Sequence, residues 1–307
     1  MVVLITGGAG YLGTVLTKNL VLEESVSKII VYDNLSRLNY NLFLGEKLPQ
    51  SDKIQFIQGD ILDLRKLKKV LTGVDVVCHL AARVTTPFAN IDSHFHEQVN
   101  HWGTAELVSA IEESNVKKFL YTSSTSVYGA SDEMIDEKVY PSPKTYYGMS
   151  KHRGEEQAKR LLSKMPAYIL RCANVYGYSR SMRFDAVINR FMFDAHFTKK
   201  ISIHGNGKQH RAFISVQLLI KVLIHLITKG DVPTGVYNVV DKNMQILDVV
   251  DVLKEIYPEL EFIFINQHLQ LRQMLVNPES ALRKYIQYEN KQDLKEELLE
   301  FKSRFSI

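Results

Sequence analysis

Residues 2–13 read Val-Val-Leu-Ile-Thr-Gly-Gly-Ala-Gly-Tyr-Leu-Gly, and this stretch decides the fold. The apolar run predicts a buried strand, and glycines at positions 7, 10 and 13 predict a tight turn that leads into a helix. Such a turn lets the backbone approach a pyrophosphate, whose charge is stabilised by the N–H groups at the start of the helix. The stretch therefore predicts the first strand, turn and helix of a dinucleotide-binding sheet.

Short apolar segments alternate with helix-length segments through the first half of the chain. This alternation predicts βαβ units, which build an α/β doubly wound parallel sheet of the Rossmann type. We expect residues 1–175 to form this domain and residues 176–307 a smaller, mixed C-terminal substrate lobe, with some later segments returning to the first domain. The predicted strands are Val2–Thr6, Lys28–Asp33, Lys53–Gln58, Val74–Ala81, Lys117–Ser123, Ala167–Arg171 and Val236–Val240, with one more near Ile201. The predicted helices are Tyr11–Glu24, Leu64–Leu71, Asp92–Ser114, Tyr146–Lys164, Ile214–Ile227 and Leu247–Tyr257.

Composition narrows the class of protein. The chain has 307 residues, 45% of them hydrophobic and 23% charged, with a formal net charge of +4. This excludes a disordered or disulfide-stapled chain, and no dense basic block suggests a nucleic-acid partner. Cys78 and Cys172 lie in apolar runs, as expected for a reducing compartment. With neither a signal peptide nor a membrane-spanning segment in the pattern, we predict a cytoplasmic protein.

The second predicted strand ends in Asp33, twenty residues beyond Gly13. A carboxylate at this position accepts hydrogen bonds from an adenosine ribose and repels a 2′-phosphate, which favours NAD over NADP. Arg37 could accommodate the extra phosphate, although an exposed loop side chain is the simpler interpretation. Asp60 follows the third strand, where it is either an adenine contact or an ordinary turn aspartate.

Tyr147 and Lys151 are four residues apart at the start of a predicted helix and therefore share one face. A free tyrosine is a poor base at neutral pH. An ammonium about 5 Å away stabilises the phenolate by about 3 kcal/mol at an effective dielectric constant of about 20. Tyr140 and Lys144 have the same spacing, but intervening prolines prevent a regular helix there.

Ser124 lies in a run of five Ser/Thr residues that ends the fifth strand of the predicted sheet. Ligands of parallel sheets bind at the carboxyl ends of the strands, so a hydroxyl here can donate to a reacting oxygen. Position alone leaves open which of the five residues does so.

Together, these motifs resemble the nucleotide-sugar epimerase/dehydratase branch of the extended short-chain dehydrogenase/reductases, in particular UDP-glucose-type 4-epimerases. The resemblance covers nearly the whole chain. It rests on Thr6–Gly13, Asp33–Ser36, Gly59–Ile61, His79–Ala82, Asn100 with Gly103 and Thr104, Ser124 with Val127–Gly129, Tyr147 with Lys151, Leu170–Gly177 and Gly205–Ile214.

The resemblance implies a catalytic Tyr147, Lys151 and Ser124 and a homodimer that uses the 92–114 helix, where Trp102 is a candidate contact. It implies bound NAD(H) with contacts from Gly7, Gly10, Tyr11, Leu12, Gly13, Asp33, Asn34, Asp60, Ile61, Leu80, Ala81, Ala82, Asn100, Tyr147 and Lys151. It implies a nucleotide-diphosphate sugar substrate contacted by Ser124, Tyr147, Asn174, Arg211 and, with an exposed surface charge as the alternative, Arg272.

The chain departs from this family at two places. The 4,6-dehydratases have Asp-Glu after the catalytic hydroxyl and the decarboxylases a glutamate, whereas this chain has Thr125 and Ser126, which cannot act as carboxylic acids or bases. The remaining reactions are 4-epimerisation, which we predict, and reduction of a 4-keto sugar. Residues 212–217 are also altered, which leaves a non-catalytic NAD(H) sensor as a third hypothesis.

Other residues receive structural interpretations. His94, His96 and His101 fall on a polar helical segment without further ligands, so we expect solvated histidines and no metal site. Phe191, Phe193 and Phe197 are expected to pack in the smaller lobe rather than to stack on a base.

Overall fold

The computed structural model describes residues 1–84, 92–266 and 273–307. Its central sheet has seven parallel strands in the order β3-β2-β1-β4-β5-β7-β11. Successive strands are added toward one edge of the sheet from β1 to β3 and toward the other edge from β4 onward. This change of direction between β1 and β4 places a ligand crevice at the carboxyl ends of these two strands. The strands are β1 (Val2–Thr6), β2 (Lys28–Asp33), β3 (Ile54–Gln58), β4 (Val76–His79), β5 (Lys118–Ser124), β7 (Ala167–Cys172) and β11 (Gly235–Val239).

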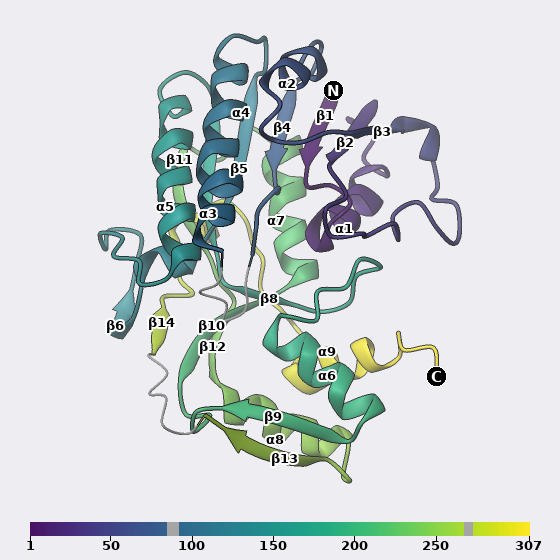
Figure 1. The fold of residues 1–307 in the computed structure, drawn as a ribbon, viewed down its shortest axis with the longest axis vertical. Helices are drawn as coiled ribbons and strands as arrows, with labels where there is room; N and C mark the ends of the chain where they lie inside the picture. Colours follow the sequence, from purple (N-terminus) through teal and green to yellow (C-terminus); the bar gives the residue numbers. More distant parts are fainter. Residues whose placement is uncertain (85–91, 267–272) are drawn as a thin grey trace.

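Helices cover both faces of this sheet because its strands are apolar on both sides (Figure 1). Val3 and Ile5 pack into one core with α1 and α7, whereas Leu4 between them belongs to a second core with α2, α4 and α5. The helices are α1 (Tyr11–Leu20), α2 (Leu64–Val70), α3 (Ser93–His96), α4 (Gly103–Glu112), α5 (Tyr146–Ala158) and α7 (Val216–Thr228). Throughout the described ranges, helices fall short of the length and hydrophobicity needed to cross a bilayer.

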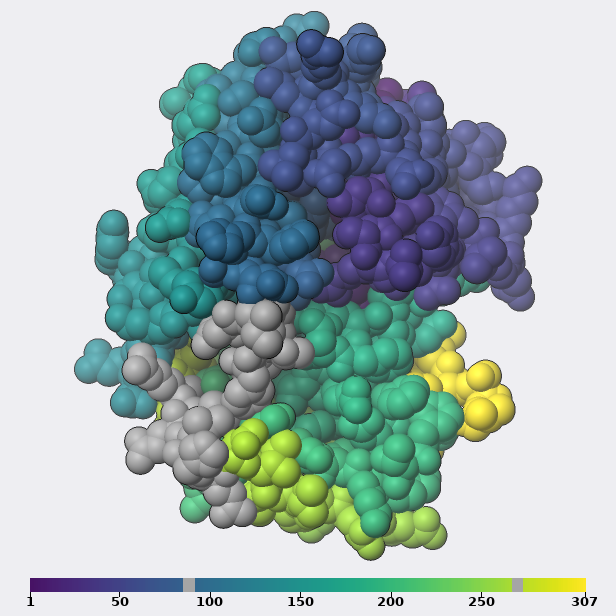
Figure 2. Space-filling view, viewed as in Figure 1, coloured from purple at the N-terminus to yellow at the C-terminus, as the bar shows by residue number. Residues whose placement is uncertain are grey.

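The second half of the chain builds a smaller lobe below the sheet, with a third core of its own (Figures 1 and 2). In Figure 2 the purple and blue first half lies above the green second half, along the junction that holds the site described below. The lobe and its extensions contain β6 (Ser131–Ile135), β8 (Asn174–Tyr176), β9 (Lys200–His204), β10 (His210–Ser215), β12 (Lys242–Gln245), β13 (Glu261–Ile265), β14 (Met274–Val276), α6 (Val187–Phe197), α8 (Ile246–Ile256) and α9 (Leu294–Lys302).

The doubly wound parallel sheet predicted from the sequence is confirmed. β11 and α7 belong to the domain of this sheet although they follow residue 176, because β11 pairs with β7 and α7 packs against α1. The helix predicted from Asp92 to Ser114 is not one regular helix, since a π-helical segment, Glu97–Trp102, separates α3 from α4. The helix predicted to start at Ile214 begins at Val216, because Ile214 belongs to β10 and pairs with Val175 of β8.

Candidate functional site

The glycine-rich turn after β1 is closely packed on its inner side and open on its outer side. A Cβ at Gly7 would lie 2.6 Å from the backbone nitrogen of Ala81, and one at Gly13 would lie 2.4 Å from the Cα of Gly8. A Cβ at Gly10 would meet only the Gly7 carbonyl, at 3.2 Å. Gly10 is the N-cap of α1 and provides no side-chain cap, so the first N–H groups of the helix remain available. The turn therefore fits a pyrophosphate.

Asp33 is fixed beside this turn at the end of β2. Its carboxylate accepts hydrogen bonds from the backbone N–H of Ala9 at 3.0 Å and of Leu35 at 2.8 Å. Asn34 donates to Asp60 Oδ2 at 2.9 Å, which joins the loops after β2 and β3. Arg37 is exposed, as expected, and donates to the Val84 carbonyl at 3.1 Å. These loops line the place where the sequence predicts the adenosine end of NAD.

Ser124 and Tyr147, two of the residues predicted to be catalytic, line one cavity of about 420 Å³. The Thr145 hydroxyl caps α5 by accepting from Gly148 N at 3.0 Å, which places Tyr147 in the first turn. A Cβ at Gly148 would lie 2.5 Å from the Ser126 carbonyl, so glycine lets α5 approach the end of β5. Burial raises the pKa of Tyr147, while Arg183 and a hydrogen bond from Ser124 act in the opposite direction.

Lys151 lies one turn further along α5 and is 2% exposed. Its Nζ lies 4.2 Å from the centroid of the Tyr121 ring, in a cation–π contact. Burial lowers the pKa of Lys151 to about 7. Lys151 shares the cavity with Tyr147, so the structure brings together the three residues predicted to carry catalysis.

A buried ion pair supports α5 from below and was not predicted from the sequence. Arg171 on β7 binds Glu155 through Nη2–Oε2 at 2.7 Å and Nε–Oε1 at 3.0 Å. Ser123 donates to Glu155 Oε1 at 2.5 Å, and Arg171 Nη1 donates to the Tyr128 hydroxyl at 3.0 Å. Glu155 is the residue four after Lys151, so the pair fixes the helix that carries the tyrosine and the lysine.

Asn174 and Arg211 line the same cavity from β8 and β10. The Asn174 amide donates to the Ala212 carbonyl at 3.0 Å, across the β8–β10 pair. Burial lowers the pKa of Arg211. Arg272 lies outside the described residues.

Arg183 and Asp185 also line the cavity, and sequence reasoning missed them. They lie in the connection between β8 and α6, where no strand end or helical spacing marks them. Arg183 Nε and Asp185 Oδ1 are 2.9 Å apart.

His96 corrects the expectation of three solvated histidines. His94 is exposed and His101 pairs with Glu97 at 3.1 Å, but His96 is 1% exposed and its ring meets the Tyr147 ring edge-on, with centroids 6.2 Å apart. Both α3 and the π-helical segment after it pack against α5. Among the described residues no group of side chains has a metal-binding arrangement. Asn100, in the same segment, brackets the Arg83 backbone through its amide oxygen at 2.7 Å and nitrogen at 2.9 Å.

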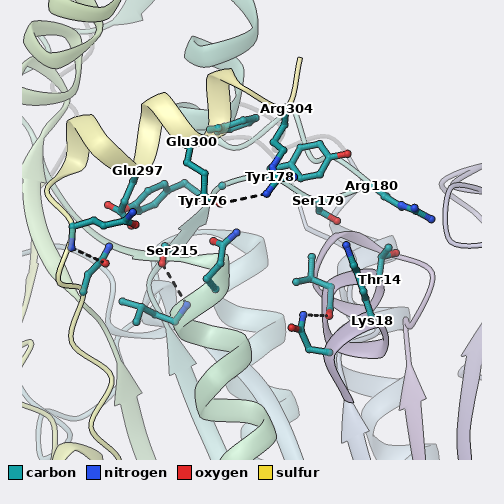
Figure 3. A pocket seen from close by; sticks show the side chains of 18 of the residues that line it. Thr14, Lys18, Tyr176, Tyr178, Ser179, Arg180, Ser215, Glu297, Glu300 and Arg304 are labelled. Carbon is teal, nitrogen blue, oxygen red and sulfur yellow. Dashed lines mark hydrogen bonds and ion pairs between the residues drawn. The ribbon is translucent and has the colours of Figure 1, made fainter. Parts of the chain in front are cut away.

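A second cavity of about 520 Å³ is lined by Tyr178, Ser179 and Arg180, which belong to the connection that carries Arg183 (Figure 3). Thr14 and Lys18 of α1 form one side of it, and Glu297, Glu300 and Arg304 of or next to α9 form the other. Acidic and basic side chains are mixed in its wall, so its charge points to no particular ligand.

The fold, the glycine-rich first turn and the second lobe define a Rossmann-fold extended short-chain dehydrogenase/reductase. Residues 3–239 match the model of the NAD dependent epimerase/dehydratase family. The chain belongs to that family, and its cofactor is NAD.

Relatives in this family catalyse different reactions. The chain is 34% identical to the dTDP-D-glucose 4,6-dehydratase of Mus musculus over 261 residues, which are 83% of this chain and 71% of the relative. It is 30% identical to a putative UDP-glucose 4-epimerase of Methanocaldococcus jannaschii over 220 residues, 70% of this chain and 69% of the relative. The UDP-glucuronic acid 4-epimerase of Bacillus cereus, solved with UDP-glucuronic acid and NAD, has a TM-score of 0.87 and 26% identity, covering 99% of this chain and 98% of that one.

Proposed function

We propose that the chain is an NAD-dependent nucleotide-sugar 4-epimerase. Bound NAD supplies a hydride acceptor that can return the hydride to the sugar. Tyr147 removes the proton from the C4 hydroxyl and later gives it back, and Ser124 donates a hydrogen bond to the reacting oxygen. Lys151 lies beneath the reacting groups, where it binds the cofactor and contributes positive charge.

One observation carries this proposal over dehydration. Among the described residues that line the cavity, Asp185 is the only one with a carboxylate, and this carboxylate is bound to Arg183. The positions after Ser124 are Thr125, which is buried, and Ser126. Removing the C6 hydroxyl needs a carboxylic acid and a base close to the sugar, whereas epimerisation needs only the tyrosine. The 34% identity to a 4,6-dehydratase makes dehydration the second candidate.

The remaining residues supply binding. The glycine turn and the N-terminus of α1 hold the pyrophosphate of NAD, Asp33 its ribose, and Asn34, Asp60, Ile61, Leu80, Ala81, Ala82 and Asn100 line its path. Asn174 and Arg211, which line the cavity, contact the diphosphate of the substrate. The Asn174 amide and the Arg211 guanidinium suit this role because both donate hydrogen bonds.

The experiment combines a variant with a cofactor assay. Tyr147→Phe should lose at least a hundredfold in turnover of every sugar nucleotide that the wild type converts, because general base catalysis contributes about 10²–10⁴-fold. A cofactor assay separates an epimerase from a 4-keto-sugar reductase. An epimerase should release one NAD per chain on denaturation and should turn over without added cofactor, whereas a reductase needs added reduced cofactor. Full activity of Tyr147→Phe would overturn the assignment, and NAD binding without turnover of any sugar nucleotide would support the sensor.

We also propose a homodimer in a reducing, cytoplasmic setting. Phe95 and Trp102 on the α3–α4 helix are 54% and 57% exposed. Exposed apolar side chains on one helical segment are candidate contacts for a second copy of the chain. Both cysteines are free and buried, as a reducing setting allows. Trp102→Glu should convert a dimer to a monomer in light scattering, and an unchanged mass would contradict this interface.

A further inference from the structure

Arg183 places a fixed positive charge in the catalytic cavity. It comes from the connection between β8 and α6, on the substrate lobe, and lines the same cavity as Tyr147. Its side chain is held by Asp185, with Nε 2.9 Å from Oδ1. The guanidinium therefore has a defined position before any ligand binds.

The backbone at Arg183 is fixed as well. Its carbonyl accepts a hydrogen bond from Asn189 Nδ2 at 3.1 Å, and Asn189 Oδ1 accepts from Gly177 N at 2.9 Å. Asn189 is fully buried, so these bonds are shielded from water. They close the connection into a compact loop.

This loop is attached to the first lobe at α1. Tyr11 donates from its hydroxyl to the Gly177 carbonyl at 2.8 Å, and Ser179 donates back to the Tyr11 carbonyl at 2.9 Å. Thr14 donates to Ser181 at 2.9 Å. The substrate lobe thus delivers Arg183 to a position set by the cofactor-binding helix.

The charge of Arg183 acts on Tyr147. Burial raises the pKa of Tyr147, and Arg183 is the largest opposing influence, ahead of the Ser124 hydrogen bond and of Arg37. Other titratable groups lie around Tyr147 or line its cavity. They are His96 on α3, Tyr121 on β5, Cys172 on β7, Lys151 on α5, His204 on β9, Arg211 on β10, Lys144 before α5, and Asp185, which is bound to Arg183.

We propose that Arg183 is a positioning residue that stabilises the phenolate of Tyr147, so that the base is complete only when the 177–185 loop is docked on α1. This rests on the proposed function in taking Tyr147 as the base. The loop from the substrate lobe thereby takes part in preparing the base, in addition to Lys151 on α5.

The test measures tyrosinate formation directly and needs no turnover. The ultraviolet absorbance of tyrosinate is followed against pH in the NAD-bound protein, and the same titration of Tyr147→Phe is subtracted to isolate Tyr147. Arg183→Gln should raise the midpoint by about one pH unit, a tenfold loss of phenolate at fixed pH. Arg183→Lys, which keeps the charge, should recover most of the shift, and Arg37→Gln should move the midpoint less than Arg183→Gln.

Arg190→Gln is the matched control. Arg190 Nε lies 2.7 Å from Asp194 Oδ2 on α6, and the side chain is exposed outside the cavity. Its midpoint should equal that of the wild type. An unchanged midpoint in Arg183→Gln would overturn the proposal. If Arg183→Gln does not fold, Arg183→Met and Arg183→Lys decide. A raised midpoint in Arg183→Met together with a midpoint near the wild type in Arg183→Lys supports the proposal, and any other pair of values overturns it. Loss of the epimerase assignment would leave this titration intact, so the two failures are distinguishable.

Discussion

The Nζ of Lys151 lies 4.2 Å from the centroid of the Tyr121 ring, with the side chain 2% exposed. The aromatic face offsets part of the cost of burying the ammonium, and Glu155 further along α5 adds a favourable charge. Burial still prevails, because it lowers the pKa of Lys151 from 10.5 to about 7. The site therefore holds this lysine at the expense of folding stability.

Lys151→Met should make the protein more stable and inactive. Between pH about 7 and 10.5 the unfolded chain holds a proton that the folded protein has lost, so the wild type gains stability as pH rises through this window. Methionine removes both the buried charge and this dependence. Thermal unfolding should show the variant a few degrees above the wild type at about pH 6, with the difference shrinking toward about pH 10. A variant less stable than the wild type at the lower pH would contradict the account.

Glu155→Gln should be strongly destabilising because it leaves the Arg171 charge buried without its partner. Removing one member of a buried pair costs about 3–5 kcal/mol. Denaturant unfolding measures the change, with Glu113→Gln as the control, since the Lys68–Glu113 pair is exposed and should contribute little. Equal effects of the two substitutions would show that the buried pair is not a support of α5.

Acid should weaken the same pair in the wild type. Burial alone would raise the pKa of Glu155, but the hydrogen bonds and the charge of Arg171, with the hydrogen bond from Ser123, outweigh it and lower the pKa to about 2. A carboxylate with a lowered pKa stabilises the fold above its unfolded value of 4.5 and loses this contribution as pH falls toward about 2. Unfolding free energies measured across this range should fall more steeply in the wild type than in Glu155→Gln. Parallel slopes would contradict the lowered pKa.

Asp33 should make the protein prefer NAD to NADP. A 2′-phosphate near this carboxylate brings like charges together at a cost of about 1–4 kcal/mol, which is roughly a ten- to thousandfold preference. Arg37 donates to the Val84 carbonyl, and its charge also acts at Asp33, so it offsets part of this repulsion without removing the preference. Titration of the cofactor-free protein with both dinucleotides measures the ratio, and Asp33→Ala should narrow it. Equal affinities in the wild type would mean that the end of β2 has been misinterpreted.

Local patterns in the sequence were enough to predict the strands and helices of the parallel-sheet domain. Lys28–Asp33 is a strand with the predicted bounds, because its β-branched and aromatic residues favour one. Tyr147 and Lys151 meet in one cavity because their spacing is that of a helix and Thr145 caps it. Such features depend on neighbours a few residues away.

Features that depend on distant parts of the chain were not predictable. The Arg171–Glu155 pair joins a strand to a helix, and Arg183 reaches the cavity through a loop held by Asn189 and α1. The buried His96 lies directly before a π-helical segment that packs against α5, and helical periodicity reveals neither the segment nor this burial. Each arises from packing between segments that the sequence presents far apart.

The most direct test of the central claim is the product formed in heavy water. Purified protein with its own bound NAD is incubated in D₂O with UDP-glucose, UDP-glucuronic acid or dTDP-glucose, and proton NMR follows the sugar, with Tyr147→Phe as the control. The account predicts interconversion with the C4 epimer for at least one of these sugar nucleotides, with the original hydrogen retained at C4 because the hydride returns from the cofactor, and no such product from the variant. Formation of a 4-keto-6-deoxy sugar carrying solvent deuterium would contradict it and identify a dehydratase.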